Sequence, residues 1–206
     1  MSTNRWLEWC RELQAIAQNG ITYGAGHFDL ERYHRLQQIA AEMIAMGSGV
    51  DPGKLVAAFA SDTGYATPKV DVRGVVFRDD RILLVKEKED GGWTLPGGWA
   101  DIGDTPAESV VREVFEESGF QTRASKVLML LDRDRQGHPS IFHHAYKIFI
   151  RCEITGGAPA DSVETEGAGF FAEDAIPSLS IMRTLPKQLT RLFEHLRNPN
   201  LPTDFE

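Results

Sequence analysis

The segment Leu95–Phe120, LPGGWADIGDTPAESVVREVFEESGF, decides how the fold is read, because a glycine-rich loop in it leads into a clearly delimited helix. Thr105 is followed by a proline and, three residues later, by Glu108. This is the pattern of a capping box with proline at the first helical position. Gly119 is a typical helix stop. The segment therefore predicts a helix of about three turns over residues 106–118.

Three carboxylates of this predicted helix lie on one face. Glu113, Glu116 and Glu117 stand at positions i, i+3 and i+4, where like charges repel by about a few tenths of a kcal/mol per pair. One interpretation is a solvated acidic face. The other is a divalent-cation site, since Mg²⁺ takes oxygen ligands and is often shared between carboxylates and phosphates. Glycines at residues 91–92 and 97–98 favour the second, because backbone without side chains approaches a ligand closely.

The spacing of these residues resembles the Nudix box, G-x5-E-x7-R-E-U-x-E-E-x-G-U, where U is an aliphatic or bulky apolar residue. In this chain the pattern begins at Gly98 and ends with REVFEESGF at residues 112–120. Every fixed position matches except one, where Asp104 replaces the glutamate of the family. That change keeps the charge and shortens the side chain.

The resemblance implies a Mg²⁺-dependent hydrolase, with Mn²⁺ as a substitute ion. Its substrate is expected to be a nucleoside diphosphate linked to a group X, and its products a nucleoside monophosphate and phosphorylated X. The implied metal ligands are the carbonyl of Gly97 and the carboxylates of Glu113, Glu116 and Glu117. Arg112 is expected to orient a glutamate through a charge-assisted hydrogen bond.

The general base is expected to be one of the helix glutamates or a carboxylate further along the chain. Glu166 is the preferred downstream candidate, in an acidic segment that also holds Asp161 and Glu164. A solvated acidic loop is the alternative interpretation. Three further residues are expected to contact the substrate: Arg73 and Lys86, for which surface solvation is the alternative, and Gly98.

Strands and helices alternate irregularly on both sides of the box. Aliphatic runs predict strands over 70–77 and 82–85, joined by a turn at Asp79-Asp80, and further strands over 127–131, 145–154 and 169–172. Another helix is predicted over 185–196. This order favours an α+β fold, a mixed-sheet α/β/α sandwich of the Nudix type, over a doubly wound parallel sheet.

The first sixty or so residues read as a separate helical region. Apolar spacing predicts helices over 6–17, ending at Asn19-Gly20, over 30–44 with Asp29 as N-cap, and over 53–59. We expect an N-terminal helical extension over 1–62 and a Nudix hydrolase domain over 67–206. Two helices alone bury too little apolar surface to stand as an independent domain.

The regions beyond the box also resemble one Nudix subgroup. Thr63–Gly74, TGYATPKVDVRG, and Asn198–Phe205, NPNLPTDF, are similar to hydrolases of X-linked nucleoside diphosphates, a subgroup that includes ADP-ribose and CDP-choline pyrophosphatases. The resemblance implies a homodimer, with the helical extension as a dimerisation or substrate-site element.

The composition is typical of a compact, soluble fold. Lys and Arg number 22 against 30 Asp and Glu, so the net charge of −8 disfavours a nucleic-acid or anionic-membrane binder. Residues 101–119 and 161–174 each carry a net charge of −5, which leaves +2 for the rest. Two cysteines build no disulfide framework, and no apolar run is long enough for a signal peptide or a membrane span. We therefore expect a cytoplasmic protein with no membrane association, and Cys10 and Cys152 as core residues.

Two other function classes remain open at this point. A Nudix-like sensor would bind ADP-ribose or another nucleotide without cleaving it, although the intact glutamates argue against this. An RNA-directed hydrolase would act on RNA ends, although the overall acidity argues against it.

Overall fold

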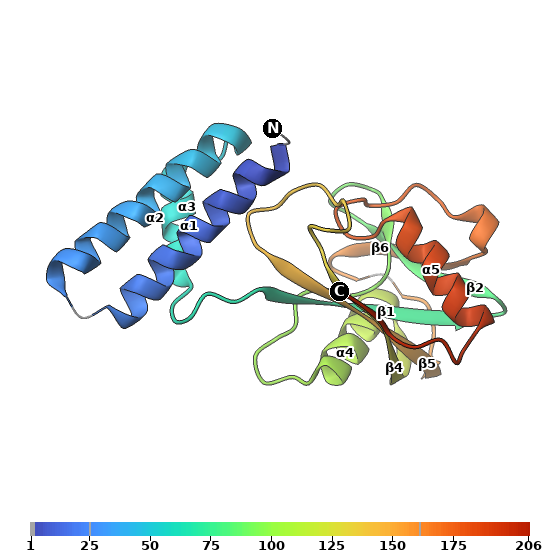
Figure 1. Cartoon of the computed structure of the whole chain (residues 1–206). Coiled ribbons are helices and arrows are strands. Elements are labelled where there is room, and N and C mark those ends of the chain that lie inside the picture. The colour runs from blue at the N-terminus through green and yellow to red at the C-terminus, as the bar shows by residue number, and fades with distance from the viewer. Residues whose placement is uncertain (1–2, 25, 161) are drawn as a thin grey trace. The chain divides into compact units, whose positions relative to one another are not determined.

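The computed structural model describes residues 3–24, 26–160 and 162–206 and divides them into two compact units. One unit joins Met1–Pro68 with the short segment Ser140–His144, and the other holds Lys69–Pro139 and Ala145–Glu206. Figure 1 shows the first unit as a group of helices and the second as a twisted sheet with helices on its faces. Among the described residues, no helix is both long and apolar enough to cross a membrane.

The helical unit contains α1 (Thr3–Tyr23), α2 (His27–Ser48) and α3 (Pro52–Ser61). Its small core includes the buried side chains of Cys10, Ala41, Ile44, Leu55 and Phe59. The segment at residues 140–144 completes this core. The Phe142 ring meets the Phe59 ring edge-on at 6.2 Å between centroids, and Arg11 Nε donates to the Phe142 carbonyl at 3.1 Å. The helical unit therefore depends on a segment distant in sequence.

Two predictions about these helices were wrong. Asn19-Gly20 does not end α1, because a Cβ on Gly20 would lie 2.4 Å from the Tyr33 ring, so this glycine allows α1 and α2 to pack closely. Asp29 is not the N-cap of α2, since the helix begins at His27 after Gly26, and Asp29 instead pairs from the first turn with Arg32 in the second. The predicted third helix is confirmed as α3, and Asp51 caps it by accepting a hydrogen bond from the Lys54 amide.

The second unit is built on a mixed seven-stranded sheet. Its strands are β1 (Lys69–Arg78), β2 (Arg81–Glu87), β3 (Trp93–Thr94), β4 (Phe120–Asp132), β5 (Ala145–Gly157), β6 (Thr165–Phe171) and β7 (Asp204–Phe205). The strand order is β3-β2-β1-β5-β4-β7, with β6 on β2. β1 pairs parallel with β5 and antiparallel with β2. This mixed sheet confirms the predicted α+β class.

The two faces of the sheet are covered by different helices, α4 (Pro106–Ser118) and α5 (Pro186–Arg197), as Figure 1 shows. Alternate residues of β1 divide between two cores, Val72 and Val76 with the α4 side chains and Val75 with the α5 side chains. α4 approaches β1 at Gly74, where a Cβ would lie 2.3 Å from Val114. A short 3₁₀ turn, η1 (Glu173–Ala175), follows β6.

The sequence located most elements of this unit. α4 has the predicted capping box between Thr105 and Glu108 and ends at Gly119 in the left-handed conformation. β4 and β6 begin earlier than predicted, at Phe120 and Thr165, because polar and glycine residues pair in the sheet as well as the aliphatic ones. Cys10 and Cys152 are both buried, as expected.

The hairpin between β1 and β2 turns through two residues with positive φ, Asp79 at 52° and Asp80 at 55°, as a two-residue type I′ turn requires. We expect Asp80→Gly to raise the free energy of unfolding by about 0.5 kcal/mol, because glycine adopts this conformation without a Cβ penalty. Asp80→Val should lower it by about 1–2 kcal/mol. Urea unfolding measures both; a valine variant as stable as the wild type would contradict the turn geometry.

Candidate functional site

The glycine-rich loop is fixed to β1 by a row of backbone hydrogen bonds. The amides of Val72 and Gly74 donate to the carbonyls of Gly98 and Pro96 at 2.8 and 2.7 Å, and the Ala100 amide donates to Val70 at 2.9 Å. The loop therefore runs along β1 almost as a further strand. This pairing fixes the position of Gly97, the residue between the two bonded carbonyls.

Gly97 has no room for a side chain. Its φ of 140° is one that residues with a Cβ rarely adopt, and a Cβ would lie 2.0 Å from the Val72 carbonyl oxygen. Its amide donates to Glu117 Oε2 at 2.8 Å. The next residue, Gly98, faces Glu113, whose Oε2 would be 3.1 Å from a Cβ at that position. The two glycines thus bring bare backbone against two of the predicted ligands.

The three glutamates differ in exposure. Glu117 is buried and Glu116 is exposed, while Glu113 lies between them. Burial raises the pKa of Glu117 to about 8, against the opposing effects of Arg73 and the Gly97 amide. Burial also raises the pKa of Glu113, although Arg112 opposes it. The cluster therefore holds negative charge only at a cost, which a bound cation would remove.

Arg112 links the helix carboxylates to the loop that precedes α4. Its guanidinium lies 2.9 Å from Glu113, 3.1 Å from Glu116, 2.9 Å from Asp101 and 3.4 Å from Asp104. One cation thus serves four carboxylates, two on the helix and two on the loop. The Arg112 guanidinium therefore joins two helix glutamates to the loop.

The other predicted site residues come from three strands of the sheet: Arg73 from β1, Lys86 from β2 and Glu166 from β6. Lys86 Nζ lies 2.7 Å from Glu166 Oε1, so these two pair across the neighbouring strands β2 and β6 at the surface. Arg73 is buried: its Nε and Nη2 donate to Asp71 at 2.7 and 3.2 Å, and its Nη1 donates to the Leu95 carbonyl at 3.2 Å. Asp161 lies outside the described residues.

Sequence reasoning missed Glu87, a buried acid at the end of β2. Arg183 Nε lies 3.0 Å from its carboxylate. Burial raises the pKa of Glu87 while Arg183 and Arg73 oppose the rise. The alternation of the strand could have indicated this burial. Leu83 and Val85 are buried on one face of β2, and Glu87, two residues further on, belongs to the same face.

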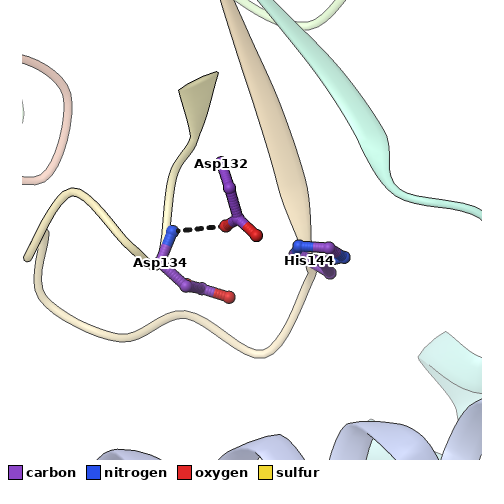
Figure 2. Close-up of side chains that lie close together, drawn as sticks. All are labelled: Asp132, Asp134 and His144. Atoms are coloured by element: carbon purple, nitrogen blue, oxygen red, sulfur yellow. Dashed lines mark hydrogen bonds between the residues drawn. The ribbon is translucent and has the colours of Figure 1, made fainter. Parts of the chain in front are cut away.

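Figure 2 shows a different acidic pair, at the end of β4. The Asp134 amide donates to Asp132 Oδ1 at 2.9 Å. This hydrogen bond is the contact of an Asx turn, so the conformation of the loop accounts for it. Figure 2 also draws His144, which belongs to the helical unit, whereas Asp132 and Asp134 belong to the sheet unit.

The geometry of the loop and of α4 agrees with comparisons to known proteins. Residues 67–193 match the family description "NUDIX domain". The chain belongs to the Nudix family. Residues 4–59 match a second description, "UDP-X-like, N-terminal oligomerisation domain". Together these matches place both the hydrolase unit and the helical region in recognised families.

Individual Nudix relatives cover most of the chain. A Bacillus subtilis protein named "Putative ADP-ribose pyrophosphatase YjhB" is 46% identical over 98% of this chain and 97% of its own length. A solved UDP-X diphosphatase is 28% identical with a TM-score of 0.64, and each chain is covered completely. An ADP-ribose pyrophosphatase from Streptococcus suis is 38% identical with a TM-score of 0.62, covering 68% of this chain and all of its own. The chain is thus a Nudix hydrolase similar to ADP-ribose pyrophosphatases.

The residues of this Nudix site fit a divalent cation. All the candidate donors are oxygen atoms, which suit a hard ion such as Mg²⁺. Glu113 and Glu117 are partly or fully withdrawn from water and gain protons readily, so their negative charge is under-compensated by Arg112 and Arg73. Gly97 and Gly98 leave the backbone beside them bare. The donor chemistry and the space therefore both suit a bound ion.

Glu117 should give the metal-free protein a characteristic pH dependence. Between its ordinary pKa of 4.5 and about 8, only the folded chain keeps this proton, so the contribution of Glu117 to the free energy of unfolding should fall as pH rises. That contribution has a slope of about −1.4 kcal/mol per pH unit, whereas His138, whose pKa burial lowers to about 4, contributes in the opposite direction at the acid end. Glu117→Gln should remove the Glu117 contribution, and the difference from wild type is measured by urea unfolding from pH 5 to 8 in EDTA.

Glu166→Gln is the matched control for this measurement. Lys86 holds the pKa of Glu166 below its usual range, so removing that carboxyl should leave the slope in place. A Glu117→Gln variant with the wild-type slope would contradict the assigned protonation.

Proposed function

We propose that this Nudix hydrolase is a Mg²⁺-dependent pyrophosphatase acting on nucleoside diphosphates linked to a group X, of the ADP-ribose or CDP-choline type. The products are a nucleoside monophosphate and phosphorylated X. The supporting observation is that Glu117 and Glu113 lie against the side-chain-free backbone of Gly97 and Gly98, while Arg112 joins Glu116 to Glu113. The relatives named as ADP-ribose pyrophosphatases and UDP-X diphosphatase support the same substrate class.

The proposed roles follow from the contacts described above. The carboxylates of Glu113, Glu116 and Glu117 and the Gly97 carbonyl would hold Mg²⁺, or Mn²⁺ in its place. When bound, the ion offsets the charge of the diphosphate and lowers the pKa of a water molecule. Arg112 keeps two of the glutamates in position.

Proton transfer and substrate contact fall to other side chains. Glu166, held by Lys86 on the adjacent strand, is the proposed downstream carboxylate, either completing the metal site or accepting a proton from water. Lys86 and Gly98 are the proposed substrate contacts. The pairing of Arg73 with Asp71 inside the sheet supports a role in holding the loop.

The direct test is hydrolysis of a substrate panel by the full chain. ADP-ribose, CDP-choline, nucleotide sugars and dinucleoside polyphosphates are incubated with Mg²⁺, and nucleoside monophosphate is measured. Release of no monophosphate from any of them would reject the proposal. Tight binding of ADP-ribose without turnover would support a sensor, and cleavage of labelled RNA alone would support an RNA-directed hydrolase.

We expect Glu116→Gln to lower kcat on the best substrate by about 100-fold, since it removes a charged ligand from the proposed ion site. Glu116 is exposed, so circular dichroism and the melting temperature should stay near wild type. Glu194→Gln on α5 is the matched control and should keep the wild-type rate. A Glu116→Gln variant with full rate at saturating Mg²⁺ would contradict the ligand assignment.

We further propose that the helical extension, residues 1–62, joins two copies of the chain. The exposed face of α1 carries Trp9, Ile16 and Tyr23 at intervals of seven residues, with 43%, 49% and 69% of each residue exposed. Seven-residue spacing of apolar side chains is typical of a helix–helix seam. α2 presents two ion pairs to solvent, Arg32 with Asp29 and Arg35 with Glu42, and its exposed apolar residues Phe28 and Met46 stand near opposite ends of the helix. The match to an oligomerisation domain supports a second copy as the occupant of the α1 stripe.

Ile16→Glu should therefore convert a dimer into a monomer in light scattering, because it buries a charge in the centre of the stripe. The helical content should not change, since Ile16 lies outside the core of the unit. Met46→Glu, on the exposed part of α2, is the matched control and should stay dimeric. A monomeric wild type, or a dimeric Ile16→Glu variant, would contradict the assignment.

A further inference from the structure

A group of charged side chains lies buried where β1 pairs with both the glycine-rich loop and β5. Asp71 and Arg73 come from β1, and Lys147 comes from β5 directly opposite Asp71. Their exposed fractions are 6%, 5% and 0%. Burying charges costs free energy that apolar residues of similar size would not. A role beyond filling the core is therefore worth seeking.

The contacts of these residues form a continuous chain that ends at the proposed metal site. Lys147 Nζ donates to Asp71 Oδ2 at 2.7 Å, and Asp71 Oδ1 accepts from Arg73 Nε at 2.7 Å. Arg73 Nη1 donates to the Leu95 carbonyl at 3.2 Å. Two residues after Leu95, the Gly97 amide donates to Glu117.

Arg73 acts at two points of the loop and helix. Besides its bond to the Leu95 carbonyl, it is the cation with the largest charge effect on Glu117. The Arg73 guanidinium serves both the Leu95 carbonyl and Glu117 in the orientation it has here. Its Nε and Nη2 hydrogen bonds to the Asp71 carboxylate fix that orientation. Asp71 in turn is held from the other side by Lys147. Without that second contact the carboxylate would be free to rotate.

We propose that Asp71 and Lys147 are positioning residues for the metal site, which act by fixing Arg73 and, through it, the Leu95–Gly97 backbone against Glu117. This inference rests on the proposed function for its consequence in catalysis. The arrangement it describes, the Gly97 amide held on the Glu117 carboxylate, is measurable without any substrate or metal.

The test uses the ¹⁵N-labelled full chain in EDTA, and hydrogen exchange of the Gly97 amide is compared with that of Gly119, the C-cap of α4. In Asp71→Asn and Lys147→Met, the Gly97 amide should exchange about 10-fold faster, while the Gly119 amide changes less than about 2-fold. The Mn²⁺ dissociation constant, measured by electron paramagnetic resonance, should rise about 10-fold. Lys147→Arg keeps the charge and should keep both values near wild type.

Asp204→Asn is the matched control in the same unit. Asp204 is likewise an aspartate held by two basic side chains, Arg191 and His195, but it fastens the C-terminal strand β7 beside α5. This variant should lower the melting temperature without changing Gly97 exchange or Mn²⁺ affinity. Loss of one buried charge can unfold the unit. The double variant Asp71→Asn/Lys147→Met removes both charges of the ion pair, and we expect from it the same changes in Gly97 exchange and Mn²⁺ affinity as from the single variants.

The outcomes separate this inference from the proposed function. The positioning role would be overturned by variants that melt at a lower temperature but keep Gly97 exchange and Mn²⁺ affinity within about 2-fold of wild type. It would also be overturned if the Gly97 amide of the wild type showed no protection from exchange. A wild type that binds Mn²⁺ but hydrolyses no substrate would reject the proposed function alone.

Discussion

The row of hydrogen bonds between β1 and the loop at residues 96–100 is the constraint on which the site depends. It requires the loop to lie so close to β1 that Gly97 has no space for a Cβ. On the adjoining face, α4 approaches β1 at Gly74 with equal closeness. The distance between Glu117 and the Gly97 amide is therefore set by backbone packing on one strand. A site built on such contacts is rigid before any ligand arrives.

The charge of the molecule is organised around the same strand. Acidic side chains gather on α4 and on the loop before it, and two arginines meet them from opposite sides. Arg112 contacts Glu113, Glu116 and the loop aspartates, while Arg73 approaches from within the sheet. Arg73 can be buried because Asp71 beside it stays ionised. Burial acts to raise the pKa of Asp71, but the charges of Arg73 and Lys147 outweigh this effect and keep the pKa below its usual range. Residues 101–119, which form this loop and helix, thus carry a net charge of −5, one of the two acidic segments behind the total of −8, and a phosphate substrate is compatible with charge placed in this way.

The bounds of α4 could be predicted from local signals. The Thr105–Glu108 capping box and Gly119 gave α4 its correct bounds, because each acts through backbone groups within a few residues. Gly20 could not be interpreted in the same way. Gly20 leaves room for Tyr33 of α2, and a contact with another helix cannot be predicted from the residues next to Gly20. The burial of Arg73 and Glu87 depends likewise on partners far along the chain, Leu95 and Arg183. Spacing could place three glutamates on one helix face, but it could not show that their exposures differ.

The single departure from the Nudix box also has a structural explanation. Asp104 is one methylene shorter than the glutamate of the family, yet its carboxylate lies 3.4 Å from Arg112 Nε. Asp101 lies closer, at 2.9 Å from Nη2 of the same guanidinium. The loop thus supplies Arg112 with two short carboxylates, and the nearer of them stands outside the position that the box specifies. The two aspartates lie on the Nε and Nη2 edge of Arg112, whereas Glu113 and Glu116 pair with Nη1. In this chain the negative charge on that edge therefore comes from two loop residues, and the shorter side chain at position 104 is accompanied by a second carboxylate at Asp101.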